Sequence, residues 1–236
     1  MHLAPCWFNS NPLHLICFHS STVEQESFKF EVDGSKPSES TCYNIIKGWH
    51  MEKPMIGIGI PTAGSMKVET VVSLINLFKE GLSLQVLFVK SSMIHANRSS
   101  IIAKALKAQC THVFFLDSDM ELPYGILSKL LGHNKEIVSI NANKKGLPLV
   151  SVVKPLKTDE DGKELFECES VGLACTLVDL KIFEVIPMPW FVSGYKEDNI
   201  TPEGEDEYFC KKARGNGFKI WCDPSMTAGH IGDYTY

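Results

Sequence analysis

Hydrophobic and polar positions follow two regular patterns from Met55 nearly to the end of the chain. Short apolar runs predict strands, and apolar residues at helical spacing between them predict helices. In the first half the expected strands are residues 55–60, 84–89, 113–116 and 137–140. The expected helices are residues 66–79, 97–109 and 122–131. This alternation with short links predicts a parallel sheet covered by helices on both faces.

Three details of this half can be checked against a structure. Pro61 is expected to end the first strand, and Leu122-Pro123 to open a helix, since proline is well tolerated in a first helical turn. The helix over residues 66–79 is amphipathic, with an apolar stripe at helical spacing. The stripe consists of Val68, Val71, Val72, Ile75 and Phe78.

The second half has a less regular pattern. Strands are expected over residues 149–154, 165–169, 173–178 and 218–222, with a charged turn at 157–162 and a helix at 205–214. The predicted fold class is therefore α/β, with a mixed, mostly parallel sheet flanked by helices. The parallel half is of the nucleotide-binding (Rossmann-like) type, and the irregular half would shape an acceptor site.

Residues 1–50 contain proline, asparagine, histidine and seven serines, with no sustained helical or strand period. We expect residues 1–52 to be a poorly structured extension and residues 53–236 to be the folded domain. The sequence that begins at Met51 resembles the natural start of an α/β domain. This raises the question whether residues 1–50 belong to the native protein. The alternative is a genuine additional subdomain.

Composition excludes several classes of protein. The chain is 44% hydrophobic and 22% charged, as is usual for a globular chain, and its net charge of −5 gives no overall basic field for nucleic acid. No apolar run approaches the ~20 residues of a membrane helix. The eight cysteines form no C-x-x-C pair, so we expect buried thiols in a reducing, cytoplasmic protein.

The first candidate site is the pair Asp117 and Asp119, which follows the apolar strand 113–116. In open α/β sheets, ligands bind at the carboxyl ends of strands. One carboxylate could bind a divalent cation such as Mg²⁺ or Mn²⁺, and the other a ribose hydroxyl or a cation-bound water. The alternative is that Asp119 caps a helix beginning at Pro123.

Two further candidates lie near the C-terminus. Acidic residues including Glu205 and Asp206 open the helix at 205–214, where they favour the helix dipole in any case. Asp206 is the better candidate for a general base, because Phe209 and Ala213 fix its place beside a packed face. His230 lies between two glycines, and its imidazole could complete a metal site with Asp119.

Together these motifs resemble a GT-A-fold glycosyltransferase, most closely the small family-2-like enzymes of bacteriophages and bacteria. The resemblance covers residues 55–232 in the chain order of that family. The segments that carry it are Ile60-Pro61-Thr62, Asn97-Arg98, Phe114 to Asp119, Gly204-Glu205-Asp206, and Cys222-Asp-Pro with Gly229-His230-Ile-Gly232.

The resemblance implies a role for each matching residue. Pro61 and Thr62 would line the nucleotide pocket, where Asn97, Arg98 and Ser118 would also bind the nucleotide-sugar. Asp117 would lie near the ribose and the metal, and Asp119 and His230 would be ligands of Mn²⁺ or Mg²⁺. Asp206, with Glu205 beside it, would be the base of an inverting enzyme. Outside these motifs, Trp190 could stack on an acceptor sugar, or be an ordinary core aromatic.

The implied function is metal-dependent transfer of a single sugar from a nucleoside-diphosphate sugar to an acceptor hydroxyl. The Q-x-x-R-W element of processive synthases is absent, which favours single transfers. The acceptor could be a glycan, a lipid-linked sugar or a modified nucleic acid, for which Lys144-Lys145 and Lys211-Lys212 offer only local positive charge. The alternatives are a sugar-1-phosphate nucleotidyltransferase and a catalytically inactive nucleotide-sugar or carbohydrate-binding module.

Overall fold

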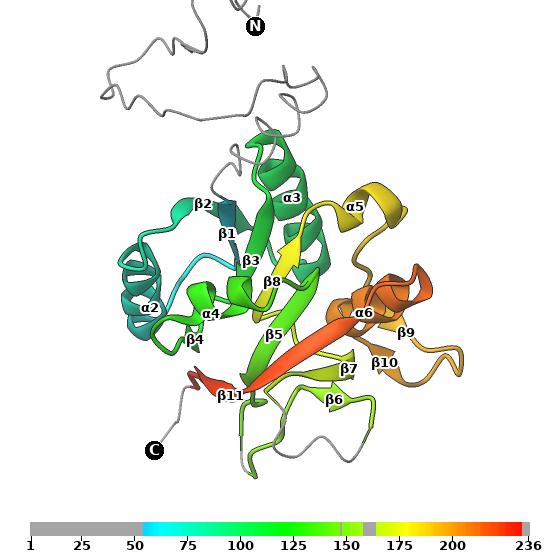
Figure 1. Cartoon of the computed structure of the whole chain (residues 1–236). Coiled ribbons are helices and arrows are strands. Elements are labelled where there is room, and N and C mark those ends of the chain that lie inside the picture. The colour runs from blue at the N-terminus through cyan, green and yellow to red at the C-terminus, as the bar shows by residue number, and fades with distance from the viewer. Residues whose placement is uncertain (1–53, 147, 158–163, 233–236) are drawn as a thin grey trace, which may run out of the picture. The chain divides into compact units, whose positions relative to one another are not determined.

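A computed structural model describes residues 54–146, 148–157 and 164–232. The expectation about residues 1–52 falls outside this part of the chain, as does nearly all of the turn expected at 157–162. The described residues form one sheet flanked by helices, and a small two-stranded ribbon of β9 (Gly194–Tyr195) and β10 (Pro202–Glu203) beside it (Figure 1).

The main sheet has the strand order β2-β1-β3-β8-β5-β11-β7-β6, with β4 paired to β11. Six of the described strands run in one direction: β1 (Met55–Thr62), β2 (Ser83–Lys90), β3 (His112–Leu116), β5 (Ile137–Ala142), β6 (Lys154–Pro155) and β11 (Ile220–His230). The other three run in the opposite direction: β4 (Met120–Glu121), β7 (Phe166–Ser170) and β8 (Cys175–Asp179). The sheet is therefore mixed and mostly parallel, as the sequence predicts.

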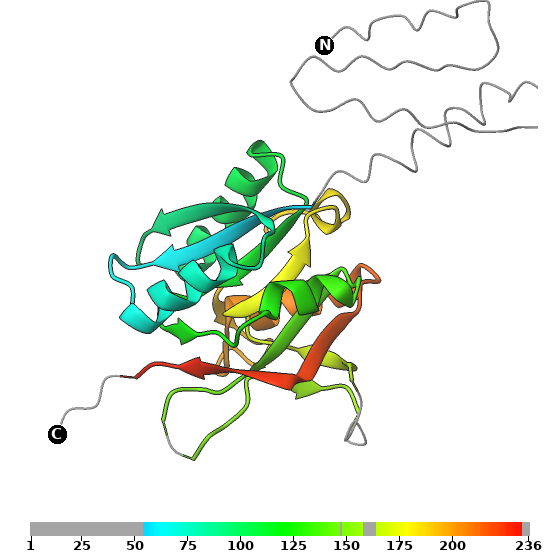
Figure 2. The same ribbon diagram turned by 60° about the vertical axis from the view of Figure 1, so that its left-hand side comes forward.

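Helices cover both faces of this sheet (Figures 1 and 2). One core cluster combines α3 (Ile94–Lys107), α5 (Ile182–Val185) and α6 (Glu205–Gly215) with side chains of β3 such as Val113 and Phe115. The other combines α2 (Val68–Phe78) and α4 (Ile126–Gly132) with the alternate side chains Phe114 and Leu116. Because successive side chains of β3 enter opposite clusters, this strand is buried on both faces.

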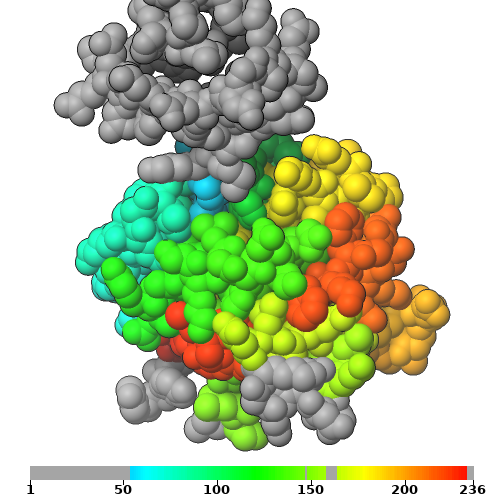
Figure 3. Space-filling model, in the orientation of Figure 1, coloured from blue at the N-terminus to red at the C-terminus, as the bar shows by residue number. Residues whose placement is uncertain are grey.

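Helix α2 forms where expected, but its apolar stripe does not face the core. Val68 is 74% exposed and Ile75 53%, whereas Thr70, Ser73 and Leu77 are buried. The Ser73 hydroxyl accepts a hydrogen bond from the Leu122 amide at 2.9 Å, so a small polar side chain satisfies a partly buried backbone group. Helical spacing identifies a stripe but not the side that meets the sheet. The cyan surface of this region is visible in Figure 3.

Two predicted boundaries are wrong. Strand β1 continues through Pro61. It pairs with β3 only as far as Gly59, so Pro61 faces a side of the strand that has no pairing partner there, and its missing N–H costs no sheet hydrogen bond. The Thr62 carbonyl faces the other side, where it accepts the Ser91 amide. Helix α4 begins at Ile126 after Gly125, whose φ is 77°, and not at Pro123.

The second half departs further from its pattern. Of the strand expected at 149–154, only Ser151, in an isolated bridge with Asn143, and Lys154, in the short strand β6 (Lys154–Pro155), pair in the described residues. Strand β11 is much longer than residues 218–222 and bulges between Asp223 and Thr227. The bulge directs the end of β11 to β4, which places His230 opposite Met120.

The predicted burial of the cysteines is confirmed for the five in the described residues. Cys110, Cys168, Cys175, Cys210 and Cys222 are all buried. Burial raises the pKa of Cys210 to about 12, which keeps its thiol protonated and unreactive. These cysteines serve as small hydrophobic core residues.

Candidate functional site

The pairing of β4 with β11 brings Asp119 and His230 together at the carboxyl end of β3. The Ile231 amide donates to the Asp119 carbonyl at 2.8 Å, and His230 Nε2 lies 3.5 Å from Asp119 Oδ2. Both side chains are about a quarter exposed, at 25% and 24%. Asp119 and His230 are far apart in the sequence, but they bring an oxygen and a nitrogen to the same partly exposed position.

A hydrogen bond at Nδ1, the ring nitrogen that does not face Asp119, fixes the orientation of His230. Its Nδ1 lies 2.9 Å from the Asn143 carbonyl, which can only accept, so Nδ1 carries the proton of the neutral ring. Nε2 then keeps its lone pair on the side of Asp119. This is the usual support of a metal-binding imidazole.

Asp119 also has a cationic neighbour within the chain. Lys145 Nζ lies 2.5 Å from Asp119 Oδ2, the same oxygen that faces His230. Lys145 comes from the segment between β5 and β6, which also contains Asn143. One short segment therefore contacts both members of the Asp119–His230 pair.

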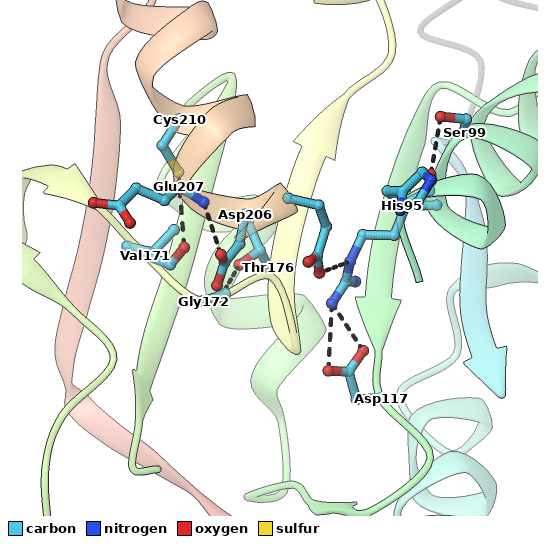
Figure 4. A network of polar contacts seen from close by, with 11 residues as sticks. His95, Ser99, Asp117, Val171, Gly172, Thr176, Asp206, Glu207 and Cys210 are labelled. Carbon is cyan, nitrogen blue, oxygen red and sulfur yellow. Dashed lines mark hydrogen bonds and ion pairs between the residues drawn. The ribbon is translucent and has the colours of Figure 1, made fainter. Parts of the chain in front are cut away.

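The guanidinium of Arg98 is buried and binds Asp117, which is labelled in Figure 4, and Glu205. Arg98 Nη2 is 3.1 Å from Asp117 Oδ1 and 3.3 Å from Oδ2, and Nε is 3.1 Å from Glu205 Oε1. The side chains of Arg98 and Glu205 are only 3% and 13% exposed, and the guanidinium lies 5.2 Å from the centre of the Phe115 ring. Burial raises the pKa of Asp117, and the charge of Arg98 opposes that rise.

Asp206 differs from its neighbour Glu205. Burial raises the pKa of Asp206, and the nearby charge of Glu205 raises it further. Its Oδ1 accepts the Glu207 amide at 2.7 Å, at the start of α6. Glu205 is held by Arg98, whereas Asp206 is a carboxylate with a raised pKa that makes no such ion pair. A raised pKa is what a general base near neutral pH needs, and the base role of Asp206, with Glu205 beside it, stays a prediction.

The predicted nucleotide-binding residues lie along the same edge of the sheet. Thr62 Oγ1 donates to the Ser65 carbonyl at 2.7 Å, directly after Pro61, and the Ser118 carbonyl accepts the Lys67 amide at 2.8 Å. Asn97 is buried, and its Nδ2 donates to the Ser91 carbonyl at 3.0 Å. This contact makes Asn97 a structural support, since its amide already has an internal partner.

Arg98 and Trp190 also have mainly internal contacts. Arg98 is 2% exposed and binds two carboxylates through Nε and Nη2, while its Nη1 is buried with no hydrogen-bond partner among the described residues, and its predicted contact with the nucleotide-sugar stays a prediction. The Trp190 indole N–H donates to the Ile186 carbonyl at 2.9 Å, and its ring packs edge-on to Phe183 with centroids 5.0 Å apart. These contacts match the alternative for Trp190, a core aromatic.

Asp119 Oδ2 and His230 Nε2 fit a divalent cation that takes only a few of its ligands from the protein. Atoms that each lie about 2.0–2.2 Å from one cation are about 3 Å apart or slightly more, close to the separation of Asp119 Oδ2 and His230 Nε2. Both oxygens of Asp117 face Arg98, so a metal-ligand role for Asp117 stays a prediction in which the cation would share those oxygens with the guanidinium. The described residues contain no group of three His, Cys, Asp or Glu placed to hold a metal. Mg²⁺-type ions commonly take few protein ligands and complete their shell with water and substrate phosphates.

Sequence reasoning missed Lys145 and Asn143. The Lys144-Lys145 pair was visible only as local positive charge, and no spacing connects it to Asp119. A backbone carbonyl such as that of Asn143 leaves no signal in residue types at all. Both contacts depend on how the segment after β5 folds back.

A cavity of about 390 Å³ lies beside α6, the helix that begins with Glu205 and Asp206. It is bordered by α6 and the β9–β10 ribbon, and Glu207 within it is bound by Lys154 and Lys196 at 2.8 and 2.9 Å. Its walls are charged, with side chains of both signs: Glu169, Lys196, Glu203, Glu207, Lys211 and Arg214. The cavity suits a strongly polar molecule.

Comparison with known proteins supports the fold. No protein family and no curated protein matches the sequence. Among solved structures, the crystal structure of A197 from STIV matches 76% of this chain and 86% of its own, with 18% identity and a TM-score of 0.56. A structure of GalNAc-T7 with UDP, GalNAc and Mn²⁺ matches 77% of this chain but 44% of its own, with 14% identity and a TM-score of 0.48. The match to A197 agrees with the fold class that the sequence predicts, an α/β domain with a mixed, mostly parallel sheet flanked by helices.

One further property concerns membranes. In the described ranges, no helix combines the length and the apolar character that crossing a bilayer requires.

Proposed function

We propose that the protein is a metal-dependent glycosyltransferase that moves a single sugar from a nucleoside-diphosphate sugar to an acceptor hydroxyl. The observation that carries the proposal is the meeting of Asp119 and His230 at the carboxyl end of β3, the end where open α/β sheets bind ligands. The GT-A-like fold agrees with it. Mn²⁺ or Mg²⁺ is the proposed cofactor.

Each residue of the site has its own proposed role. Asp119 and His230 would hold the cation, which would neutralise the charge of the leaving diphosphate. The Asn143 carbonyl keeps the His230 ring turned toward Asp119. Pro61, Thr62 and Ser118 lie where the nucleotide end of the donor would bind, along the edge formed by β1 and β3.

Asp206 is the proposed base. Its carboxylate would accept the proton of the acceptor hydroxyl as that oxygen attacks the anomeric carbon, and the bond to the diphosphate would break. This step forms no covalent bond to the protein, so it implies inversion at the anomeric carbon.

Arg98 connects these parts. By binding Asp117 after β3 and Glu205 at the start of α6, it fixes the distance between the edge of the sheet and the helix that carries Asp206. A base must lie within hydrogen-bond reach of its proton, so this distance matters for transfer.

A panel of nucleoside-diphosphate sugars tests the proposal. Each sugar is added with Mn²⁺, and thermal stability and release of nucleoside diphosphate are measured, since a bound ligand raises the apparent stability. Asp119→Ala is expected to abolish Mn²⁺-dependent release and to keep the thermal transition of the free protein. Glu121→Ala, which removes an exposed carboxylate from β4, is the matched control and should keep the activity.

The same panel separates the alternatives. A sugar-1-phosphate nucleotidyltransferase would consume nucleoside triphosphate and sugar phosphate and leave the nucleotide-sugars intact. An inactive binding module would be stabilised by a nucleotide-sugar without releasing nucleoside diphosphate. Undiminished Mn²⁺-dependent release by Asp119→Ala would refute the cation site.

A further inference from the structure

Lys145 is the one residue at the site whose contact the proposed function does not yet use. Its Nζ lies 2.5 Å from Asp119 Oδ2, although the side chain is 49% exposed and could extend into solvent. Asp119 Oδ2 is also the oxygen that faces His230 Nε2 at 3.5 Å. A positive charge thus already lies at the place where Asp119 and His230 would hold a cation.

The backbone explains why Lys145 reaches this place. After β5 the chain folds back on itself: the Val152 amide donates to the Ala142 carbonyl at 2.9 Å, and the Lys144 amide to the Val150 carbonyl at 2.8 Å. Asn143 within this turn is hydrogen-bonded to His230 at 2.9 Å. The position of Lys145 is therefore set by the same segment that orients His230.

An ammonium and a divalent cation on the same oxygen of Asp119 oppose each other. A cation bound by Asp119 would lie about 2.1 Å from Oδ2, while Lys145 Nζ is 2.5 Å from that atom. Two positive charges so close would repel each other strongly, because Coulomb energy grows as the separation falls. The divalent ion has twice the charge and can also use the lone pair of His230 Nε2.

We propose that Lys145 occupies the cation place on Asp119 in the free protein and is displaced when a divalent cation binds with a diphosphate. This inference rests on the proposed function, since it assumes the cation site at Asp119 and His230. Once displaced, the Lys145 ammonium is within reach of the diphosphate that accompanies the cation, which makes it a binding residue for that group. The cation alone then binds weakly, and cation and diphosphate bind best together.

The test measures Mn²⁺ binding directly, with no activity assay. The electron paramagnetic resonance signal of free Mn²⁺ is followed as wild-type protein, Lys145→Met or Lys144→Met is added, first with Mn²⁺ alone and then with inorganic pyrophosphate. Lys144→Met removes an equal charge from the neighbouring residue and is the matched control. Asp119→Ala shows whether the measured site is the one described.

Lys145→Met is expected to bind Mn²⁺ alone about fivefold more tightly than the wild type, the scale of a lost exposed ion pair. Pyrophosphate should tighten Mn²⁺ binding less in Lys145→Met than in the wild type, by about the same factor. Lys144→Met should follow the wild type in both measurements.

Two results would overturn the inference in distinguishable ways. If Asp119→Ala loses Mn²⁺ binding but Lys145→Met binds Mn²⁺ no more tightly than the wild type, the cation site stands and the role of Lys145 is wrong. If neither the wild type nor Lys145→Met binds Mn²⁺, with or without pyrophosphate, the cation site of the proposed function fails, and the inference fails with it.

Discussion

Arg98 donates from Nε to Glu205 Oε1 over 3.1 Å and so joins the middle of α3 to the first residue of α6. The same guanidinium holds Asp117 through Nη2. Because Arg98 is buried, its charge depends on these two carboxylates for compensation, and their positions depend on it. The ion network therefore ties the helix that carries Asp206 to the strand end that carries Asp119.

Arg98→Met should lower the free energy of unfolding by about 3–5 kcal/mol, the usual cost of removing one partner from a buried ion network. Asp117 and Glu205 would then repel each other without a cation between them. Urea unfolding followed by circular dichroism measures the change. Lys104→Met on the exposed side of α3 is the control, and a loss for Arg98→Met no greater than for Lys104→Met would contradict the assigned role.

Asp206→Asn should reduce kcat by about 10²–10⁴-fold and leave donor binding unchanged, because the amide cannot accept the proton of the acceptor hydroxyl. In the wild type, only ionised Asp206 acts as a base, so the rate should fall as the pH decreases through its pKa. Burial raises that pKa, which places the fall above the pH of ~3.9 at which an ordinary aspartate titrates.

A pH–rate profile and a donor-binding titration check both expectations. Asp198→Asn changes an exposed aspartate of the β9–β10 turn and serves as the control. Transfer that survives in Asp206→Asn would mean that another group removes the proton, or that the configuration is retained.

The fold class could be read from the sequence because the buried strands carry a strong local signal. Strand β3 is apolar on both faces, and the two aspartates that follow it mark the carboxyl end where ligands bind. The sequence predicts a metal site shared by Asp119 and His230 from their residue types and from the family resemblance. The physical cause of their meeting is the bulge of β11 and the pairing with β4, which local patterns do not reveal.

The remaining contacts depend on tertiary packing that the sequence does not encode locally. Arg98 has the residue type of a surface helix arginine, and only its burial between Asp117 and Glu205 shows its role. Lys145 depends on a chain reversal after β5. Helix α2 shows the same limit, because the sequence predicts its helical period correctly but not which side of the helix is buried.

The assignment of the faces of α2 can be tested by a matched pair of substitutions. Leu77 is 2% exposed, so Leu77→Ala should cost about 2–5 kcal/mol of unfolding free energy through the cavity it leaves. Ile75 is 53% exposed, and Ile75→Ala should change stability by about 0.5 kcal/mol or less. Chemical denaturation of both variants measures the difference, and the reverse order would mean that the apolar stripe faces the core.

Asp223 anchors the bulge of β11 to α4 and should control stability in acid. Its side chain is fully buried; Oδ2 lies 2.8 Å from His133 Nε2 and 3.3 Å from Lys129 Nζ, and Oδ1 accepts the Ser225 amide at 2.8 Å. Burial alone would raise the pKa of Asp223, but these hydrogen bonds hold it below its ordinary value. A lowered pKa in the folded state adds stability above the unfolded pKa of ~3.9, and this stability is lost as the pH falls through the folded pKa.

Asp223→Asn should therefore cost about 1–3 kcal/mol at neutral pH, because its amide nitrogen cannot accept the bonds that one carboxylate oxygen accepts. The deficit relative to the wild type should shrink as the pH falls below ~3.9 and through the lowered folded-state pKa of Asp223, where the wild-type carboxyl becomes protonated as well. Urea midpoints of both proteins across this range measure it, with Glu69→Gln on the exposed side of α2 as the control. A deficit that stayed constant with pH would show that Asp223 acts through its shape and not through its charge, and the link between α4 and the bulge would then not be ionic.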